Sequence, residues 1–139
     1  MGSGEWEVES EGMGGAPQEI GERAFAFAVR VVKLCRVLNE TRGISRTLST
    51  QLLRAGTSIG ANLAESKGGQ SRADFLSKVS IALKESRETH YWLRLLVATE
   101  IIAEQQLTSL LDESSQITAI LTSIVKNLKA NKPPCPPNF

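Results

Sequence analysis

The chain has 139 residues, enough for one compact core and too few for two. Only 5% of its residues are aromatic, so the core must consist mainly of Leu, Ile, Val and Ala, which favours an all-α class. The formal net charge is +1, and the longest apolar run, residues 24–38, is interrupted by Arg30 and Lys33. This composition excludes a membrane span and predicts no membrane partner.

The two ends of the sequence differ in composition from the middle. Residues 1–17 are rich in Gly and Glu and have little to bury, which predicts a disordered acidic leader. Residues 132–139 are rich in proline and predict an extended tail that cannot continue a helix. Cys35 and Cys135 form no disulfide framework. Without a signal-peptide pattern, we expect reduced thiols and a cytoplasmic protein.

The first predicted helix spans residues 18–39, where apolar residues recur at steps of three and four. Its other side carries four cations with no acidic residue between them: Arg23, Arg30, Lys33 and Arg36. Five glutamates lie within residues 1–19, which leaves ten of the 15 acidic residues against all 16 basic ones in the remainder. The four cations are candidate nucleic-acid contacts, and the alternative is an ordinary solvated surface.

The second predicted helix, residues 45–67, carries a polar stripe beside its apolar seam. The stripe repeats at heptad-like steps and includes Arg54, Ser58, Asn62 and Glu65. Polar groups that face another helix need partners. If the second and third helices pack antiparallel, Arg54 falls opposite the region of Glu85 and Glu88, which predicts an ion pair with one of these carboxylates.

Two glycines interrupt the same helix. Gly56 and Gly60 each cost about 1 kcal/mol relative to alanine in a helix interior. Something must compensate for this cost, and we expect either close approach of a neighbouring helix or a local bend. Contact with a ligand is the alternative.

The third predicted helix spans residues 71–104, and the fourth spans residues 109–131. Tyr91 and Trp92 lie beside the polar centre of the third helix, which makes them either rim residues of a lone bundle or anchors between subunits. Four amphipathic helices joined by short turns predict an antiparallel up-down-up-down four-helix bundle over residues 18–131.

The residues that could support catalysis do not have the required spacing. Di-iron bundles use Glu-x-x-His from two helices, but the residue three after Glu85 is Glu88, the residue three after Glu88 is Tyr91, and His90 is the single histidine. Neither cysteine has a histidine nearby in the sequence, and no phosphate-loop or nucleophile-elbow pattern occurs. The sequence therefore predicts no catalytic residue, metal or cofactor, and no small-molecule substrate.

Residues 51–65, QLLRAGTSIGANLAE, resemble the signature of the four-helix-bundle proteins associated with intervening sequences of bacterial 23S ribosomal RNA genes. Several pairs and triplets of the third helix are similar to the same family: Asp74-Phe75, Ile81-Ala82, Glu85-Ser86, Glu88-Thr89 and Tyr91-Trp92-Leu93. The resemblance covers about residues 24–129.

This resemblance implies a left-handed bundle that assembles into a ring, usually a homopentamer, with no known enzymatic activity. Relatives include the accessory protein of diversity-generating retroelements, a basic pentamer that binds nucleic acid and a reverse transcriptase. The motif positions, which the resemblance gives a structural or interface role, are Arg54, Ser58, Asn62, Glu65, Glu85 and Glu88.

Two functions compete on this basis. The first is a non-catalytic homo-oligomeric scaffold or adaptor, whose partner is a copy of itself. The alternative is an accessory subunit that binds RNA or DNA, acts with an RNA or a reverse transcriptase, and uses the cations of residues 23–36.

Overall fold

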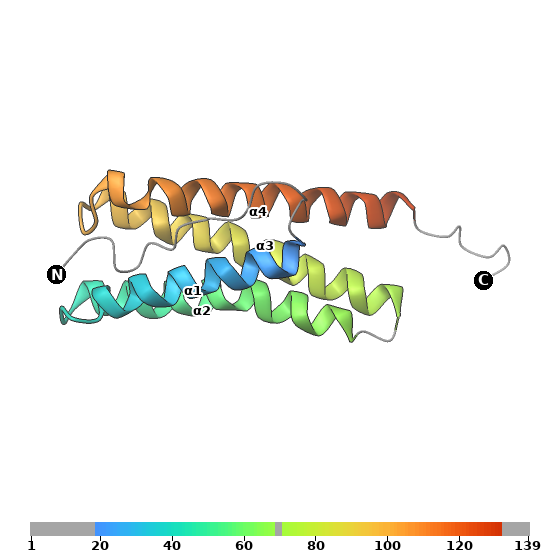
Figure 1. Ribbon diagram of the computed structural model, residues 1–139, viewed down its shortest axis with the longest axis horizontal. Coiled ribbons are helices and arrows are strands. Elements are labelled where there is room, and N and C mark those ends of the chain that lie inside the picture. The colour runs from blue at the N-terminus through green and yellow to red at the C-terminus, as the bar shows by residue number, and fades with distance from the viewer. Residues whose placement is uncertain (1–18, 69–70, 132–139) are drawn as a thin grey trace, which may run out of the picture.

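The computed structural model describes residues 19–68 and 71–131. This part of the chain forms four helices: α1 (Ile20–Leu38), α2 (Ile44–Lys67), α3 (Arg72–Ala98) and α4 (Glu104–Ala130). Consecutive helices run in opposite directions, and each packs against two neighbours in the cyclic order α1, α2, α3, α4 (Figure 1). The predicted all-α, up-down-up-down four-helix bundle is confirmed. The predicted leader and tail lie outside the described residues.

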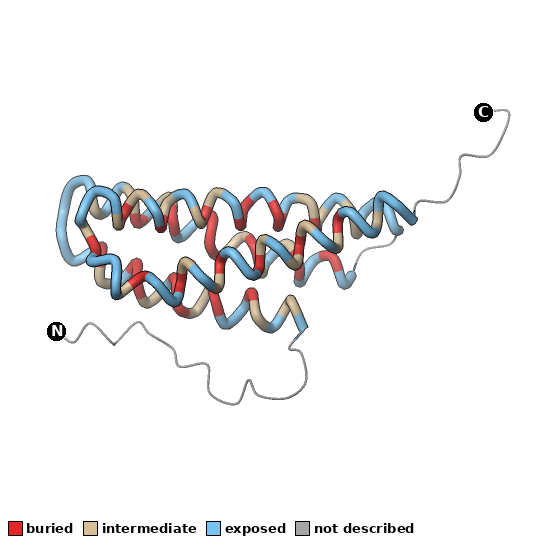
Figure 2. Tube along the Cα trace, turned by 90° about the horizontal axis from the view of Figure 1, so that it is seen from above, coloured by how far each residue is buried: buried red, intermediate tan, exposed pale blue. Residues whose placement is uncertain are grey.

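The core follows the apolar stripes of the four helices. Buried residues line the inner side of every helix over most of its length (Figure 2). The largest of the fully buried side chains are Phe27 and Leu34 from α1, Leu52 and Ile59 from α2, Leu93 and Leu96 from α3, and Leu107, Leu110, Ile117 and Leu121 from α4. Every helix therefore depends on its neighbours to remove its apolar face from water.

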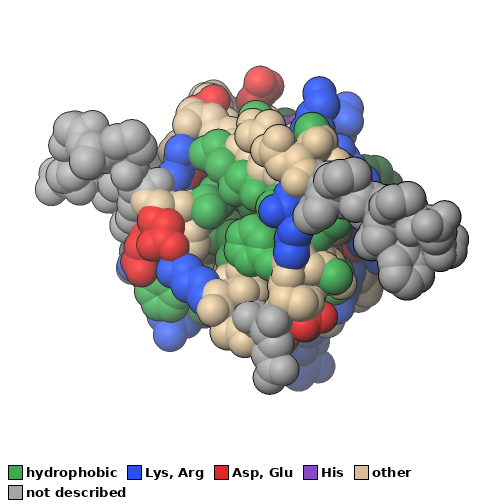
Figure 3. All heavy atoms as spheres, turned by 90° about the vertical axis from the view of Figure 1, so that its right-hand side faces the viewer, with side chains coloured by type: hydrophobic (Ala, Val, Ile, Leu, Met, Phe, Trp, Pro, Cys, Tyr) green, Lys and Arg blue, Asp and Glu red, His purple; other side chains and the backbone are tan. Residues whose placement is uncertain are grey.

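Hydrophobic side chains also reach the surface at the end of the bundle where α2 leads into α3 (Figure 3). The helix turns nearest this end carry partly buried Ile20, Phe75, Leu76 and Ile124. Because α1 begins at Ile20 and pairs with the middle of α4, the last turns of α4 extend beyond α1 within the described residues (Figure 1).

The boundary between the third and fourth helices differs from the sequence prediction. α3 ends at Ala98 instead of residue 104, and α4 begins at Glu104 instead of residue 109. The backbone N–H of Ile101 donates to the Leu96 carbonyl (N···O 3.1 Å), and Glu100 has a left-handed φ of 64°. This is a Schellman-type helix end built without glycine, so the usual sequence signal was missing.

The two glycines of α2 lie where α2 meets α1. A Cβ atom on Gly56 would lie 2.8 Å from Cγ1 of Val31, and one on Gly60 would lie 3.5 Å from the backbone of Ala24. The expected close approach of a neighbouring helix is confirmed at both positions.

Gly56→Ala and Gly60→Ala form a matched pair that tests this packing. We expect Gly56→Ala to lower the free energy of unfolding by about 1–3 kcal/mol, because Val31 must move. Gly60→Ala places its methyl group at an ordinary contact distance and gains about 1 kcal/mol of helix propensity, so its stability should stay unchanged or rise. Urea unfolding of both variants measures the difference, and equal effects would contradict the packing argument.

Glu100→Gly tests the helix end. A side chain in the left-handed region costs about 1–2 kcal/mol, so glycine should raise the free energy of unfolding by about 1 kcal/mol. Thr99→Gly, one residue earlier at a negative φ, is the control and should instead destabilise the protein. Thermal unfolding followed by circular dichroism distinguishes the two.

Candidate functional site

Arg54 ties α2 to α3 on the outer side of the bundle. Its Nη1 lies 3.5 Å from Oε2 of Glu85, and its Nη2 contacts Oε2 of Glu88. The same Glu88 oxygen accepts a hydrogen bond from the indole Nε1–H of Trp92 at 3.0 Å. The predicted ion pair is confirmed, and the guanidinium is shared between both carboxylates.

This geometry perturbs the titration of Glu88. The hydrogen bond from Trp92, followed by the positive charge and hydrogen bond of Arg54, holds the pKa of Glu88 below its usual value. Glu88 is thus favoured in its charged form, while the neighbouring Glu85 is buried beneath the guanidinium. The cluster locks the register of α2 against α3.

The rest of the polar stripe divides into two kinds of contact. Glu65 accepts a hydrogen bond from Nζ of Lys78 at 2.9 Å, a second tie between α2 and α3. Ser58 donates its hydroxyl to the carbonyl of Arg54 at 2.7 Å, and Asn62 donates its amide to the carbonyl of Ser58 at 2.8 Å. Ser58 and Asn62 therefore bond to the backbone of their own helix and do not join two helices.

Tyr91 and Trp92 have different surroundings although they are adjacent. Their ring centroids lie 5.1 Å apart in an edge-on arrangement. Trp92 is half-buried and held by Glu88, whereas the Tyr91 residue is 54% exposed. Trp92 belongs to the α2–α3 seam, and Tyr91 presents its ring to the exterior.

The four cations predicted to form one accessible face of α1 are split by the structure. Arg23 makes two hydrogen bonds to the carboxylate of Glu113 on α4, at 3.1 and 2.7 Å. Arg30 is only 8% exposed and donates to Oγ of Ser109 at 2.7 Å. The prediction of one accessible row of cations is therefore wrong, because Arg23 and Arg30 bond to α4. Lys33 is half-buried and Arg36 is exposed.

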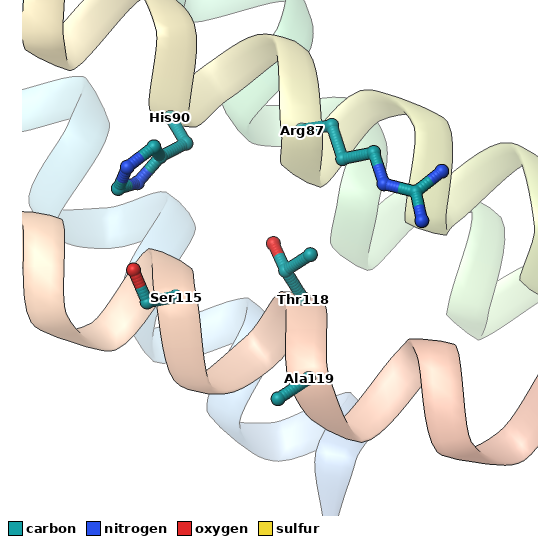
Figure 4. A pocket seen from close by; sticks show the side chains of 5 residues that line it. All are labelled: Arg87, His90, Ser115, Thr118 and Ala119. Atoms are coloured by element: carbon teal, nitrogen blue, oxygen red, sulfur yellow. The ribbon is translucent and has the colours of Figure 1, made fainter.

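A groove between α3 and α4 was missed by the sequence analysis. One hollow of about 310 Å³ is lined by Arg87, His90, Ser115, Thr118 and Ala119, which project from facing turns of the two helices (Figure 4). A second hollow of about 480 Å³ shares Ala119 and continues along α4: Thr122, Ser123, Lys126 and Asn127. The signal that could have found the first hollow is the spacing of Arg87 and His90, which are three residues apart and so share one side of the third helix.

The serine–histidine contact beside this groove does not resemble a nucleophilic site. Nδ1 of His90 lies 2.7 Å from Oγ of Ser114, but Ser114 is fully buried and donates its hydroxyl to the carbonyl of Leu111 at 3.0 Å. Burial, together with the positive charge of Arg94, lowers the pKa of His90. The interaction thus stabilises the α3–α4 contact without exposing a nucleophile.

Metal binding and membrane insertion have no structural support in the described part of the chain. Residues 19–68 and 71–131 contain no group of three or more His, Cys, Asp or Glu side chains placed to hold a metal ion. None of the four helices in this part is long and apolar enough to cross a membrane.

A sequence model of the family described as 23S rRNA-intervening sequence protein matches residues 17–123. The chain belongs to this family. A solved structure of a protein of unknown function, from the S23 ribosomal protein family of Bacteroides thetaiotaomicron, is similar with 44% sequence identity and a TM-score of 0.72. The similarity covers 78% of this chain and 99% of that one. Comparison with curated proteins finds no match.

Glu88→Gln tests the charged cluster. Because the folded state lowers the pKa of Glu88, its stabilisation is present above the usual glutamate pKa of about 4.3 and disappears as pH falls through the lower folded value. We expect the variant to lose about 0.5–1 kcal/mol of unfolding free energy at pH 7 and to match the wild type at strongly acid pH. Glu40→Gln, an exposed position in the α1–α2 turn, is the control for urea unfolding across pH, and a pH-independent loss would contradict the argument.

Proposed function

We propose that this protein is a non-catalytic scaffold subunit that assembles with copies of itself. The observation that carries the proposal is an exposed apolar face along α1 and α2. Phe25 is 67% exposed, and Val32 and Leu53 are also among the exposed large hydrophobic residues. Exposed apolar side chains gathered on one face of a small protein are typical of a contact surface.

Helix geometry puts these three side chains together. Phe25 and Val32 are seven residues apart, so they share one side of α1. Leu53 is three residues before Gly56, whose Cβ position faces α1, so Leu53 lies on the side of α2 nearest α1. A hollow of about 330 Å³ beside Phe25 is lined in part by Gly60 and Ala64, which leaves room for a side chain from a partner.

Two further exposed apolar side chains lie on a different helix. Ile81 and Tyr91 are exposed on α3. Exposed apolar residues on two different faces favour a head-to-tail contact, in which the α1–α2 face of one copy meets the α3 face of the next, and such contacts form a ring when the rotation between copies closes. The resemblance to the family favours five copies in the ring.

The proposal of a non-catalytic role rests on the chemistry of the described residues. Arg54 pairs with the carboxylates of Glu85 and Glu88, and Lys78 pairs with that of Glu65. Ser114, the serine beside His90, is buried. The proposal places the scaffold in the cytoplasm, where buried Cys35 would remain a free thiol.

Light scattering coupled to size-exclusion chromatography tests the assembly. Wild-type protein at micromolar concentration should have a mass close to five times 15.1 kDa, and Phe25→Glu should reduce it to a single copy. Thr108→Glu, which adds the same charge at an exposed position of α4, should keep the wild-type mass. A monomeric wild type would contradict the proposed function.

Mixing two variants tests which faces meet. Tyr91→Glu should also dissociate the ring, but a mixture of Phe25→Glu and Tyr91→Glu retains one intact contact, between the unmodified α3 face of the first and the unmodified α1–α2 face of the second. We therefore expect a heterodimer in the mixture. Two monomers that do not associate would contradict the head-to-tail arrangement.

A further inference from the structure

The hydrogen bonds around His90 decide which of its ring nitrogens carries the proton. Oγ of Ser114 donates its single hydrogen to the Leu111 carbonyl at 3.0 Å, so it accepts from Nδ1 of His90, which lies 2.7 Å away. Burial and the charge of Arg94 lower the pKa of His90, which favours the neutral ring. A neutral imidazole has one N–H, and Nε2 of His90 is therefore a hydrogen-bond acceptor.

The same side chain lines the hollow of about 310 Å³ between α3 and α4, together with two donors. Within residues 19–68 and 71–131, the Arg87 guanidinium and the Ser115 hydroxyl have no ion pair or hydrogen bond. Figure 4 shows Arg87 and His90 on α3, with Ser115 and Thr118 pointing toward them from α4. Arg87 and His90 are three residues apart, about 5–6 Å between their Cβ atoms, so a rotamer change can turn the guanidinium toward the imidazole.

None of the residues that line this hollow is acidic. The carboxylates closest to Ser115 along α4 are engaged elsewhere, because Asp112 accepts from Nε2 of Gln116 at 2.8 Å and Glu113 accepts from Arg23. No acidic residue follows Glu113 in α4. The hollow therefore combines one positive charge, one hydroxyl donor and one acceptor nitrogen, which is a set that fits an anion with a proton of its own.

The acceptor nitrogen distinguishes between anions of similar size and charge. Sulfate can accept from a guanidinium and a hydroxyl, but it has no proton at neutral pH, so its oxygen lone pairs would face the lone pair of Nε2. Hydrogenphosphate keeps one P–OH group and can donate it. A phosphomonoester loses its last proton at about pH 6, and a phosphodiester has no P–OH group, so neither supplies this donor at pH 8.

We propose that the hollow between α3 and α4 binds inorganic hydrogenphosphate, with its charged oxygens against Arg87 and the Ser115 hydroxyl and its P–OH group donating to Nε2 of His90. Charge-assisted bonds from a guanidinium provide the main attraction, and the bond to Nε2 provides the selectivity. Arg87 and Ser115 are both exposed, so the ion can enter from solvent. The site uses none of the apolar side chains of the proposed self-assembly and does not depend on it.

Nuclear magnetic resonance of the full chain, with isotopic label in the histidine ring, tests the tautomer and the ligand together at pH 8. His90 is the single histidine, so its ring signals are identified directly. Without ligand we expect the Nδ1–H tautomer, and added inorganic phosphate should shift the Nε2 signal to saturation. Sulfate and methyl phosphate should bind about fivefold more weakly, because each lacks the hydrogen bond to Nε2.

Two variants test the donors in the same titration. Arg87→Gln and Ser115→Ala should each weaken phosphate binding by about threefold or more. The control Arg42→Gln removes an equal charge from an exposed position in the α1–α2 turn and should leave the affinity unchanged. Circular dichroism checks folding, and Ser115→Ala alone still tests the site if Arg87→Gln unfolds the chain.

Each of four results would overturn the proposal. They are an Nε2–H tautomer in the unliganded protein, no response of His90 to phosphate, sulfate or methyl phosphate binding as tightly as phosphate, and equal weakening by the control and the two hollow variants. Light scattering of the same sample keeps the two proposals apart. A monomer whose His90 responds to phosphate as expected would contradict the ring and support this site.

Discussion

Pairing of polar groups at the seams between helices is the constraint on which this bundle depends. A guanidinium or carboxylate beside an apolar core costs free energy unless it finds a partner. Arg54 satisfies Glu85 and Glu88 together, and Arg23 satisfies Glu113 with two hydrogen bonds. These contacts determine how far each helix can slide along its neighbour, because a shift of one turn would separate the charges while leaving the apolar faces in contact.

Close packing of α1 on α2 is the second constraint. Glycine at positions 56 and 60 brings the two helix backbones together. Phe25 and Val32 lie on the outer side of α1, whereas Val31 is buried against Gly56. The proposed contact surface is therefore next to the close contact between α1 and α2.

Charge is distributed unequally over the seams of the bundle. The α2–α3 seam uses its carboxylates to neutralise its cations, which suits a structural contact. The α3–α4 seam uses hydroxyl groups and an imidazole inside, and Arg87 lies at the edge of the hollow beside it.

Periodicity and composition were sufficient to predict four helices, their antiparallel order and the partners of Arg54, because these depend on spacing along single helices and on one short turn. The family was predicted from the resemblance of residues 51–65 and of the third helix to known proteins. The end of α3 could not be predicted, since Glu100 adopts a left-handed conformation that glycine usually marks. The use of Arg23 and Arg30 within the bundle, and the groove beside Arg87, were decided by tertiary structure alone. Each depends on which residues α4 places opposite α1 and α3, and that register is absent from the pattern of any single helix.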